Sequence, residues 1–175
     1  THPHKDMEIL TYVLEGAVEH QDSMGNKEQV PAGEFQIMSA GTGVRHSEYN
    51  PSNTEKLHLY QIWIRPDQAR VAPRYEQRQF PRQEGFQLLL SPDGEEGSLH
   101  VYQDMRLWRW FSPVEGGRSE PYTVGGRAIW LQVSRGRVEV DGIVLEAGDA
   151  MALKDEPELV LSATSEAEVL LFDLP

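Results

Sequence analysis

The sequence predicts an all-β fold built from two β-barrels. Short runs rich in β-branched and aromatic residues alternate with turns, and little helical periodicity is present. The pattern also repeats, because the spacing from Gly16 to Gly33 is close to that from Gly136 to Gly148. Two barrels of common origin therefore account for the chain of 175 residues.

The first half reads as a series of strands. Strands are predicted over residues 8–14, 17–20, 35–38 and 57–64, with tight turns over 22–26 and 31–34. Gly16 breaks the first run, and two glycines, Gly41 and Gly43, bring the chain sharply into His46. Residues 57–64 are apolar on both faces, as expected for a strand inside a sandwich or barrel.

The character of the chain changes after the first half. Three prolines interrupt residues 66–83, five arginines lie between Arg65 and Arg82, and no apolar period survives. An arm that binds anions would explain the arginines, but acidic neighbours such as Asp67 and Glu76 favour a solvated linker. We therefore expect an N-terminal barrel over residues 1–65, a linker over 66–83 and a C-terminal barrel over 84–175.

The second half repeats the style of the first without its histidines. Strands are predicted over residues 86–91, 98–103, 106–111, 128–133, 138–144 and 168–174, with a hairpin turn at Asp141-Gly142. Five of the six histidines fall in the first 58 residues, and His100 is the only one here. The C-terminal barrel is therefore expected to hold no metal.

Composition narrows the classes of function. The chain has 16 basic and 28 acidic residues, and the net charge of -12 disfavours the phosphate attraction behind most nucleic-acid binding. The lack of cysteine excludes disulfides and thiolate metal sites. No apolar run reaches the length of a membrane span and no signal peptide is visible, although the chain opens at Thr1. We expect neither nucleic acid nor membrane as a direct partner.

Two short motifs predict a metal site. His2 and His4 form one pair at i and i+2, and His46 and Glu48 form another. On strands, side chains two apart point to the same face, so two adjacent strands would bring all four together. Three imidazoles and a carboxylate suit a divalent transition metal such as iron, manganese, nickel, copper, cobalt or zinc. With four protein ligands, an octahedral ion would keep two coordination positions open. Either pair of ligands alone would also be expected by chance.

Four runs of the chain carry a family resemblance: His2-Pro3-His4-Lys5-Asp6-Met7-Glu8, Glu19-His20-Gln21-Asp22, Met38-Ser39-Ala40-Gly41-Thr42-Gly43 and His46-Ser47-Glu48. They resemble the pirin family of the cupin superfamily, and most of all its bacterial members described as quercetin 2,3-dioxygenases. The resemblance implies a bicupin of two jelly-roll-like barrels, with iron foremost among the metals and a cytoplasmic location. Pirins carry strands ahead of this motif, which we expect the N-terminal barrel to lack.

The resemblance implies metal ligands at His2, His4, His46 and Glu48. The general cupin pattern would instead use Glu8. We favour Glu48, because it lies two residues from His46 on one strand, and Glu8 would then hydrogen-bond and orient a ligand imidazole. The remaining histidines, His20, His58 and His100, are expected to be structural or surface residues.

The resemblance further implies a dioxygenase that cleaves the heterocycle of flavonols such as quercetin, with release of carbon monoxide. Flavonol and dioxygen are then the partners, and Glu48 accepts the proton of the 3-hydroxyl, whose pKa the metal lowers. Candidate pocket walls are Met7, Phe35, Gln36, Met38, Gln61 and Trp63, each of which would equally suit an ordinary barrel core.

Two other functions stay open. Pirins are also known as regulators, so the chain could be a non-enzymatic, redox-sensing protein with a protein partner, which an exposed apolar patch would favour. It could also be another cupin enzyme, which acts on small anions through a cationic pocket. A wide, uncharged mouth lined by aromatic side chains would favour the flavonol.

Overall fold

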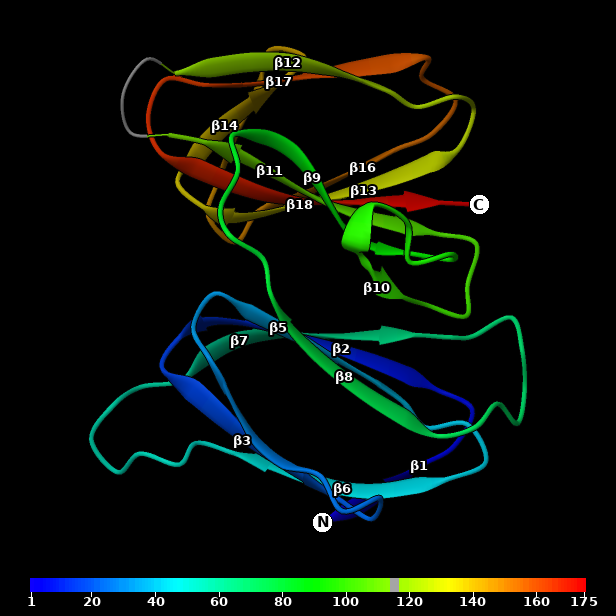
Figure 1. The fold of residues 1–175 in the computed structure, drawn as a ribbon. Coiled ribbons are helices and arrows are strands. Elements are labelled where there is room, and N and C mark those ends of the chain that lie inside the picture. The colour runs from blue at the N-terminus through cyan, green and yellow to red at the C-terminus, as the bar shows by residue number, and fades with distance from the viewer. Residues whose placement is uncertain (114–116) are drawn as a thin grey trace. The chain divides into compact units, whose positions relative to one another are not determined.

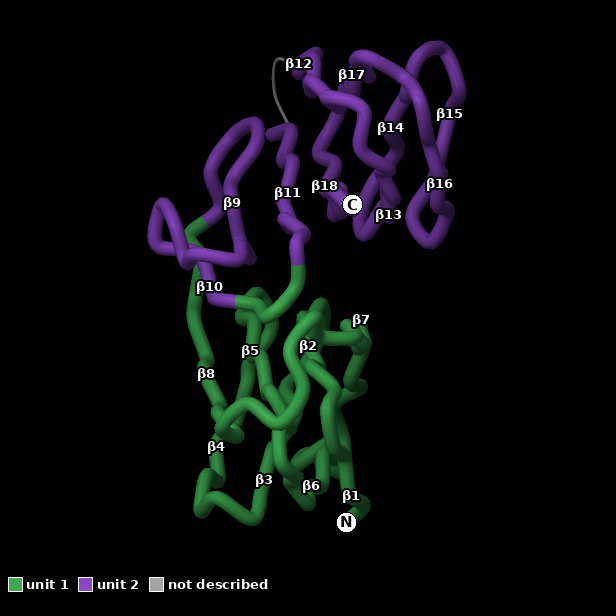
Figure 2. The backbone as a smooth tube through the Cα atoms, turned by 90° about the vertical axis from the view of Figure 1, so that its right-hand side faces the viewer, with its two compact units in different colours: residues 1–81, 101–103 green, residues 82–100, 104–175 purple. Residues whose placement is uncertain are grey.

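The structure is a computed structural model that describes residues 1–113 and 117–175 (Figure 1). Apart from one 3-10 turn at Glu95–Gly97, its regular elements are strands. The chain divides into two compact units, the first of residues 1–81 and 101–103 and the second of residues 82–100 and 104–175 (Figure 2). Across the described residues, no helix is long and apolar enough to cross a membrane.

The first unit consists of two four-stranded sheets. One sheet has the order β1 (His2–His4), β6 (Val44–Tyr49), β3 (Ala17–Asp22) and β4 (Lys27–Pro31). The other has the order β7 (His58–Ile64), β2 (Glu8–Glu15), β5 (Glu34–Ser39) and β8 (Arg74–Gln79). Apolar side chains of both sheets meet between them, as where Val13 of β2 packs with Val18 and Val30 of β3 and β4. This burial holds the sheets face to face.

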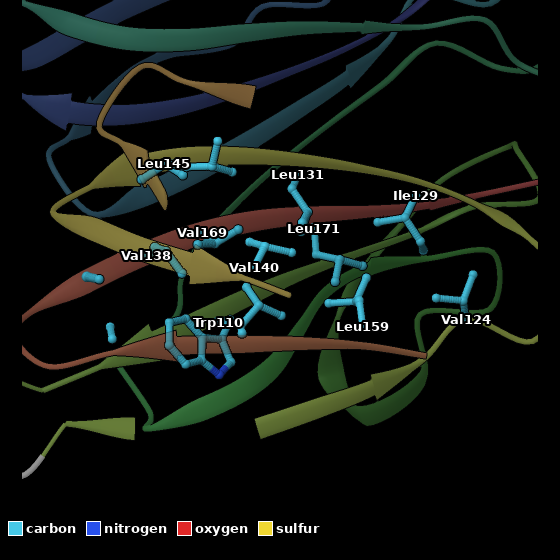
Figure 3. Close-up of a cluster of buried hydrophobic side chains, with 14 residues drawn as sticks. Trp110, Val124, Ile129, Leu131, Val138, Val140, Leu145, Leu159, Val169 and Leu171 are labelled. Atoms are coloured by element: carbon cyan, nitrogen blue, oxygen red, sulfur yellow. The ribbon is translucent and has the colours of Figure 1, made fainter. Parts of the chain in front are cut away.

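The second unit also has two sheets. Its larger sheet has the order β10 (Leu99–His100), β9 (Gly85–Ser91), β11 (Arg106–Ser112), β18 (Ala167–Leu174), β13 (Ala128–Arg135) and β16 (Ala150–Leu153). The smaller has the order β12 (Arg118–Thr123), β17 (Glu158–Ala163), β14 (Arg137–Val140) and β15 (Ile143–Glu146). Trp110 and Leu171 of the larger sheet and Leu159 of the smaller lie in one buried cluster (Figure 3).

The two units repeat one strand plan. The order β12-β17-β14-β15 matches β1-β6-β3-β4, strand for strand along the chain. The corner glycines, Gly16 after β2 and Gly136 after β13, also match, with φ of 76° and 74°. A Cβ at Gly16 would lie 2.2 Å from the Lys56 carbonyl oxygen, and a Cβ at Gly136 would lie 2.1 Å from the Glu166 carbonyl oxygen. A side chain at either position would therefore clash with backbone. The repeat predicted from glycine spacing is thus present in the structure.

The structure differs from the sequence expectation in two respects. The sheets of the described chain are open, because their edge strands do not pair into closed barrels. Residues 66–83, expected to be a linker, contain β8, which pairs with β5 from Arg74↔Ser39 to Gln79↔Glu34. The strand escapes prediction because it is polar on both faces, as edge strands often are.

Candidate metal centre

Strand β1 lies against β6 close to the N-terminus (Figure 1). Three imidazoles meet on these two strands. The antiparallel register pairs His2 with His46, which places their side chains on one face. His4 lies two residues along β1 on that same face. The ring centroids of His2, His4 and His46 are separated by 4.6 to 4.8 Å, and each pair of rings meets edge to face.

This arrangement fits a bound metal ion. The Nε2 atoms of His2 and His46 are 3.0 Å apart, and two nitrogens about 2.1 Å from one ion at right angles would be about 3.0 Å apart. The buried Nε2 of His4 has no hydrogen-bond partner, which leaves a lone pair available. The pKa of His4 is lowered by burial, the largest cause, and by the nearby His2. Burial also lowers the pKa of His46, to about 4. Both rings therefore stay neutral near pH 7, as metal ligation requires.

Glu48 lies beside these imidazoles and is surrounded by hydrogen-bond donors. The amides of Gln36 and Gln61 donate to its two carboxylate oxygens, and Thr11 Oγ1 donates to Oε1 at 3.4 Å. Burial alone would raise the pKa of Glu48, but the facing His20, His46 and the Gln36 amide outweigh it and hold that pKa below its usual value. Glu48 is therefore a fixed carboxylate that ionises readily.

His20 is the functional candidate that sequence reasoning missed. It is fully buried on β3, directly opposite Glu48 of β6, and its Nδ1 is 3.7 Å from Glu48 Oε1. Its Nε2 is 3.1 Å from Asp22 Oδ2. Burial lowers the pKa of His20, but the two facing carboxylates outweigh it and raise that pKa above its usual value. Only the strand register could have revealed this neighbour.

Two overlapping groups of possible metal ligands result. One is His2, His4 and His46, and the other is His20, His46 and Glu48, with ligand atoms in each group within 4.8 Å of one another. Both groups lie in the first unit, within the part of the chain that the structure describes. On β12 and β17, the counterparts of β1 and β6, Tyr122 pairs with Leu159 at the place where His2 pairs with His46.

Glu8 is not brought to the imidazoles, which corrects the role expected for it. Its buried carboxylate accepts hydrogen bonds from Ser39 Oγ at 2.7 Å and from the backbone N of Tyr102 at 2.8 Å, and lies 3.4 Å from Arg74 Nη2. Because side chains alternate along a strand, Glu8 and Thr11 of β2 face opposite sides of the sheet. Thr11 contacts Glu48, so Glu8 points away from it.

The residues expected to line a pocket divide into three sets. Gln36, Gln61 and Trp63 lie at the site: Trp63 is 57% exposed, and its ring meets that of His4 edge to face at 5.2 Å. Met7 and Met38 pack in the core with Ile9, Ala40 and Val44. Phe35 lies on the opposite face of its sheet, stacked on Tyr12 at 4.1 Å.

His58 is exposed beside Tyr60, and His100 belongs to the second unit.

Known proteins share this sequence and fold. The family model described as Pirin matches residues 1–64, and that described as Quercetinase C-terminal cupin domain matches residues 88–174. A quercetin 2,3-dioxygenase of Escherichia coli is 61% identical over 100% of this chain and 75% of that protein.

Two solved structures bear on the fold. The crystal structure of the bacterial pirin YhhW from Escherichia coli in complex with nickel(II) superposes with a TM-score of 0.92, at 60% identity, over 99% of this chain and 75% of that one. A cupin 2 conserved barrel domain protein from Leptotrichia buccalis, at 16% identity, covers 99% of this chain and 77% of that one with a TM-score of 0.58, which shows a cupin-type fold. By sequence, fold and the clustered histidines, the chain belongs to the pirin family.

Proposed function

We propose that this chain is a metal-dependent dioxygenase that cleaves the heterocycle of flavonols such as quercetin, with release of carbon monoxide. The observation that carries the proposal is the cluster of three imidazoles with the unpartnered Nε2 of His4 beside the exposed ring of Trp63. The names of its relatives support the substrate class. The two units would be the two domains of a bicupin, with β8 part of the first, and only the first would hold metal.

The proposed ligands are His2, His4, His46 and Glu48, and the nickel-bound relative supports a divalent transition metal, of which iron is our first candidate. Such an ion would act as a Lewis acid that acidifies a bound hydroxyl. The chain's own residues orient and deprotonate the substrate. Trp63 offers an exposed aromatic face next to His4, against which a planar flavonol can stack.

Glu48 would accept the proton of the flavonol 3-hydroxyl. A carboxylate with a lowered pKa is ionised at neutral pH, which is the form that can accept a proton, and the metal-acidified hydroxyl is the group that supplies it. Gln36 and Gln61 keep both its oxygens in place, and Gln61 in turn accepts a hydrogen bond from Trp63 Nε1 at 3.3 Å. The proton acceptor and the stacking residue are thus linked through one amide.

A flavonol-consumption assay tests the proposal. Metal-loaded protein is mixed with quercetin in air, the loss of flavonol absorbance is followed, and carbon monoxide is measured in the headspace. Chelated, metal-free protein serves as the control. Consumption with carbon monoxide that depends on metal supports the proposal. No consumption at any metal loading would reject it and favour the regulatory, non-enzymatic alternative with a protein partner.

A second candidate is a cupin enzyme that acts on a small anion. A cavity of about 360 Å³ is lined by Pro3, Lys5 and Arg45, among others. The pair Pro3↔Arg45 alternates with His2↔His46, so this opening lies on the other face of β1 and β6 from the imidazoles. Lys5 and Arg45 make this opening locally positive, although the net charge of the chain is -12, and a locally positive opening attracts a small anion. Metal-dependent turnover of small carboxylates with no turnover of quercetin would favour this reading. A cytoplasmic location stays a prediction under either function.

A further inference from the structure

We propose that His20, anchored by Asp22, is a positioning residue that holds the Glu48 carboxylate toward the metal site. The inference rests on the proposed metal centre and goes beyond its four ligands. It assigns a role to a buried histidine that neither motif contains.

The strand register sets up the contact. β3 and β6 pair antiparallel, with His20 directly opposite Glu48 and Asp22 directly opposite His46. Side chains of directly opposed residues lie on one face with Cβ atoms about 4.5–5.5 Å apart. The sheet therefore places the His20 side chain directly beside Glu48, with its Nδ1 3.7 Å from Glu48 Oε1.

Asp22 makes His20 a rigid support. Its side chain is fully buried and faces His20 Nε2 at 3.1 Å. The same carboxylate accepts hydrogen bonds from the backbone N of Met24 at 2.9 Å and of Asn26 at 3.1 Å, and from Asn26 Nδ2 at 2.8 Å. The hairpin tip thus fixes Asp22, and Asp22 fixes one edge of the imidazole.

The other edge of the imidazole is turned toward Glu48. Tyr75 stacks on the ring at 4.6 Å with the planes 30° apart, which limits rotation about the Cβ–Cγ bond. The buried Nδ1 has no hydrogen-bond partner, and a shift of well under 1 Å would bring it within hydrogen-bond distance of Glu48 Oε1. Partners of this kind orient a ligand and raise metal affinity.

The role predicts coupling between two substitutions. Ni²⁺ affinity is measured by calorimetry for His20→Gln, alone and combined with Glu48→Gln, with His58→Gln as the matched control because that histidine is exposed on β7. We expect His20→Gln to weaken Ni²⁺ binding roughly 10–100-fold when Glu48 is present. In the Glu48→Gln background it should have almost no effect, and His58→Gln should change nothing.

The same samples separate positioning from ligation and from misfolding. X-ray absorption should count the same number of imidazoles on Ni²⁺ with and without His20, because His20 is not a ligand. Thermal unfolding of the metal-free variants checks the fold. If His20→Gln does not fold, Asp22→Asn replaces it, since it keeps the imidazole and removes its anchor.

Three results would overturn the inference. They are an unchanged Ni²⁺ affinity in His20→Gln, an equal loss in both backgrounds, or one imidazole fewer on the metal. A wild-type chain that binds no Ni²⁺ would instead overturn the metal centre itself, and the inference with it.

Discussion

The carboxylate of Glu8 accepts a hydrogen bond of 2.8 Å from the backbone N of Tyr102, and so lies on the side of β2 away from the imidazoles. Glu48 occupies the place beside them. The two glutamates therefore have different roles, which substitution can separate.

We predict that Glu48→Gln impairs the metal site and that Glu8→Gln impairs only stability. Glutamine at position 48 removes the proposed base, so turnover should fall about 10²–10⁴-fold and metal should bind more weakly. Glutamine at position 8 removes the buried negative charge that faces Arg74 Nη2 and should cost about 1–3 kcal/mol of unfolding free energy, with metal affinity unchanged. Metal titration and urea unfolding of both variants check this, and loss of metal in Glu8→Gln would return the site to the general cupin pattern.

A second prediction concerns the repeated corner glycines. Gly136→Ala should destabilise the protein more than Gly142→Ala, although both positions have positive φ, 74° and 83°. A Cβ at 136 would lie 2.1 Å from the Glu166 carbonyl oxygen, whereas at 142 it meets open space. The difference in unfolding free energy should be about 1–3 kcal/mol. Equal losses in urea unfolding would mean that only the backbone conformation matters.

A third prediction is an alkaline loss of stability that depends on Tyr122. Burial, and then the hydrogen bond to Asp173 at 2.7 Å, raise the pKa of Tyr122 above its usual value. The stability from the neutral phenol is complete below the unfolded pKa of about 10 and is lost as pH rises toward the folded value.

Tyr122→Phe removes this contribution. The stability gap between wild type and variant should therefore shrink above pH 10, as measured by urea unfolding from pH 8 upward. The comparison with the variant cancels the contribution of Tyr75, whose pKa is also raised by burial. A gap that stays constant with pH would contradict the assignment.

Much of the site follows from local sequence, because a spacing of two residues fixes a common face on a strand. That rule predicted the pairs His2 with His4 and His46 with Glu48. It could not decide the position of Glu8, because Asp6 between β1 and β2 has φ of 48°, so alternation does not carry across it. It could not find His20, whose closeness to Glu48 comes from pairing of distant strands.

The strands also divide into those that local sequence predicts and those that depend on pairing with distant parts of the chain. Runs with apolar alternation or full burial, such as β2, β5 and β18, were predicted almost to their ends and are confirmed. Polar strands such as β8 and β12 were missed, because edge strands need no apolar face and their pairing partners lie far along the chain.

The most direct test of the proposed centre is a crystal structure of the Ni²⁺-loaded protein, with the ion located by its anomalous scattering. We predict one ion, bound by imidazole nitrogens of His2, His4 and His46 and by a carboxylate oxygen of Glu48, with His20 facing that carboxylate rather than the ion. An ion bound by His20, or one held in the second unit, would contradict the account.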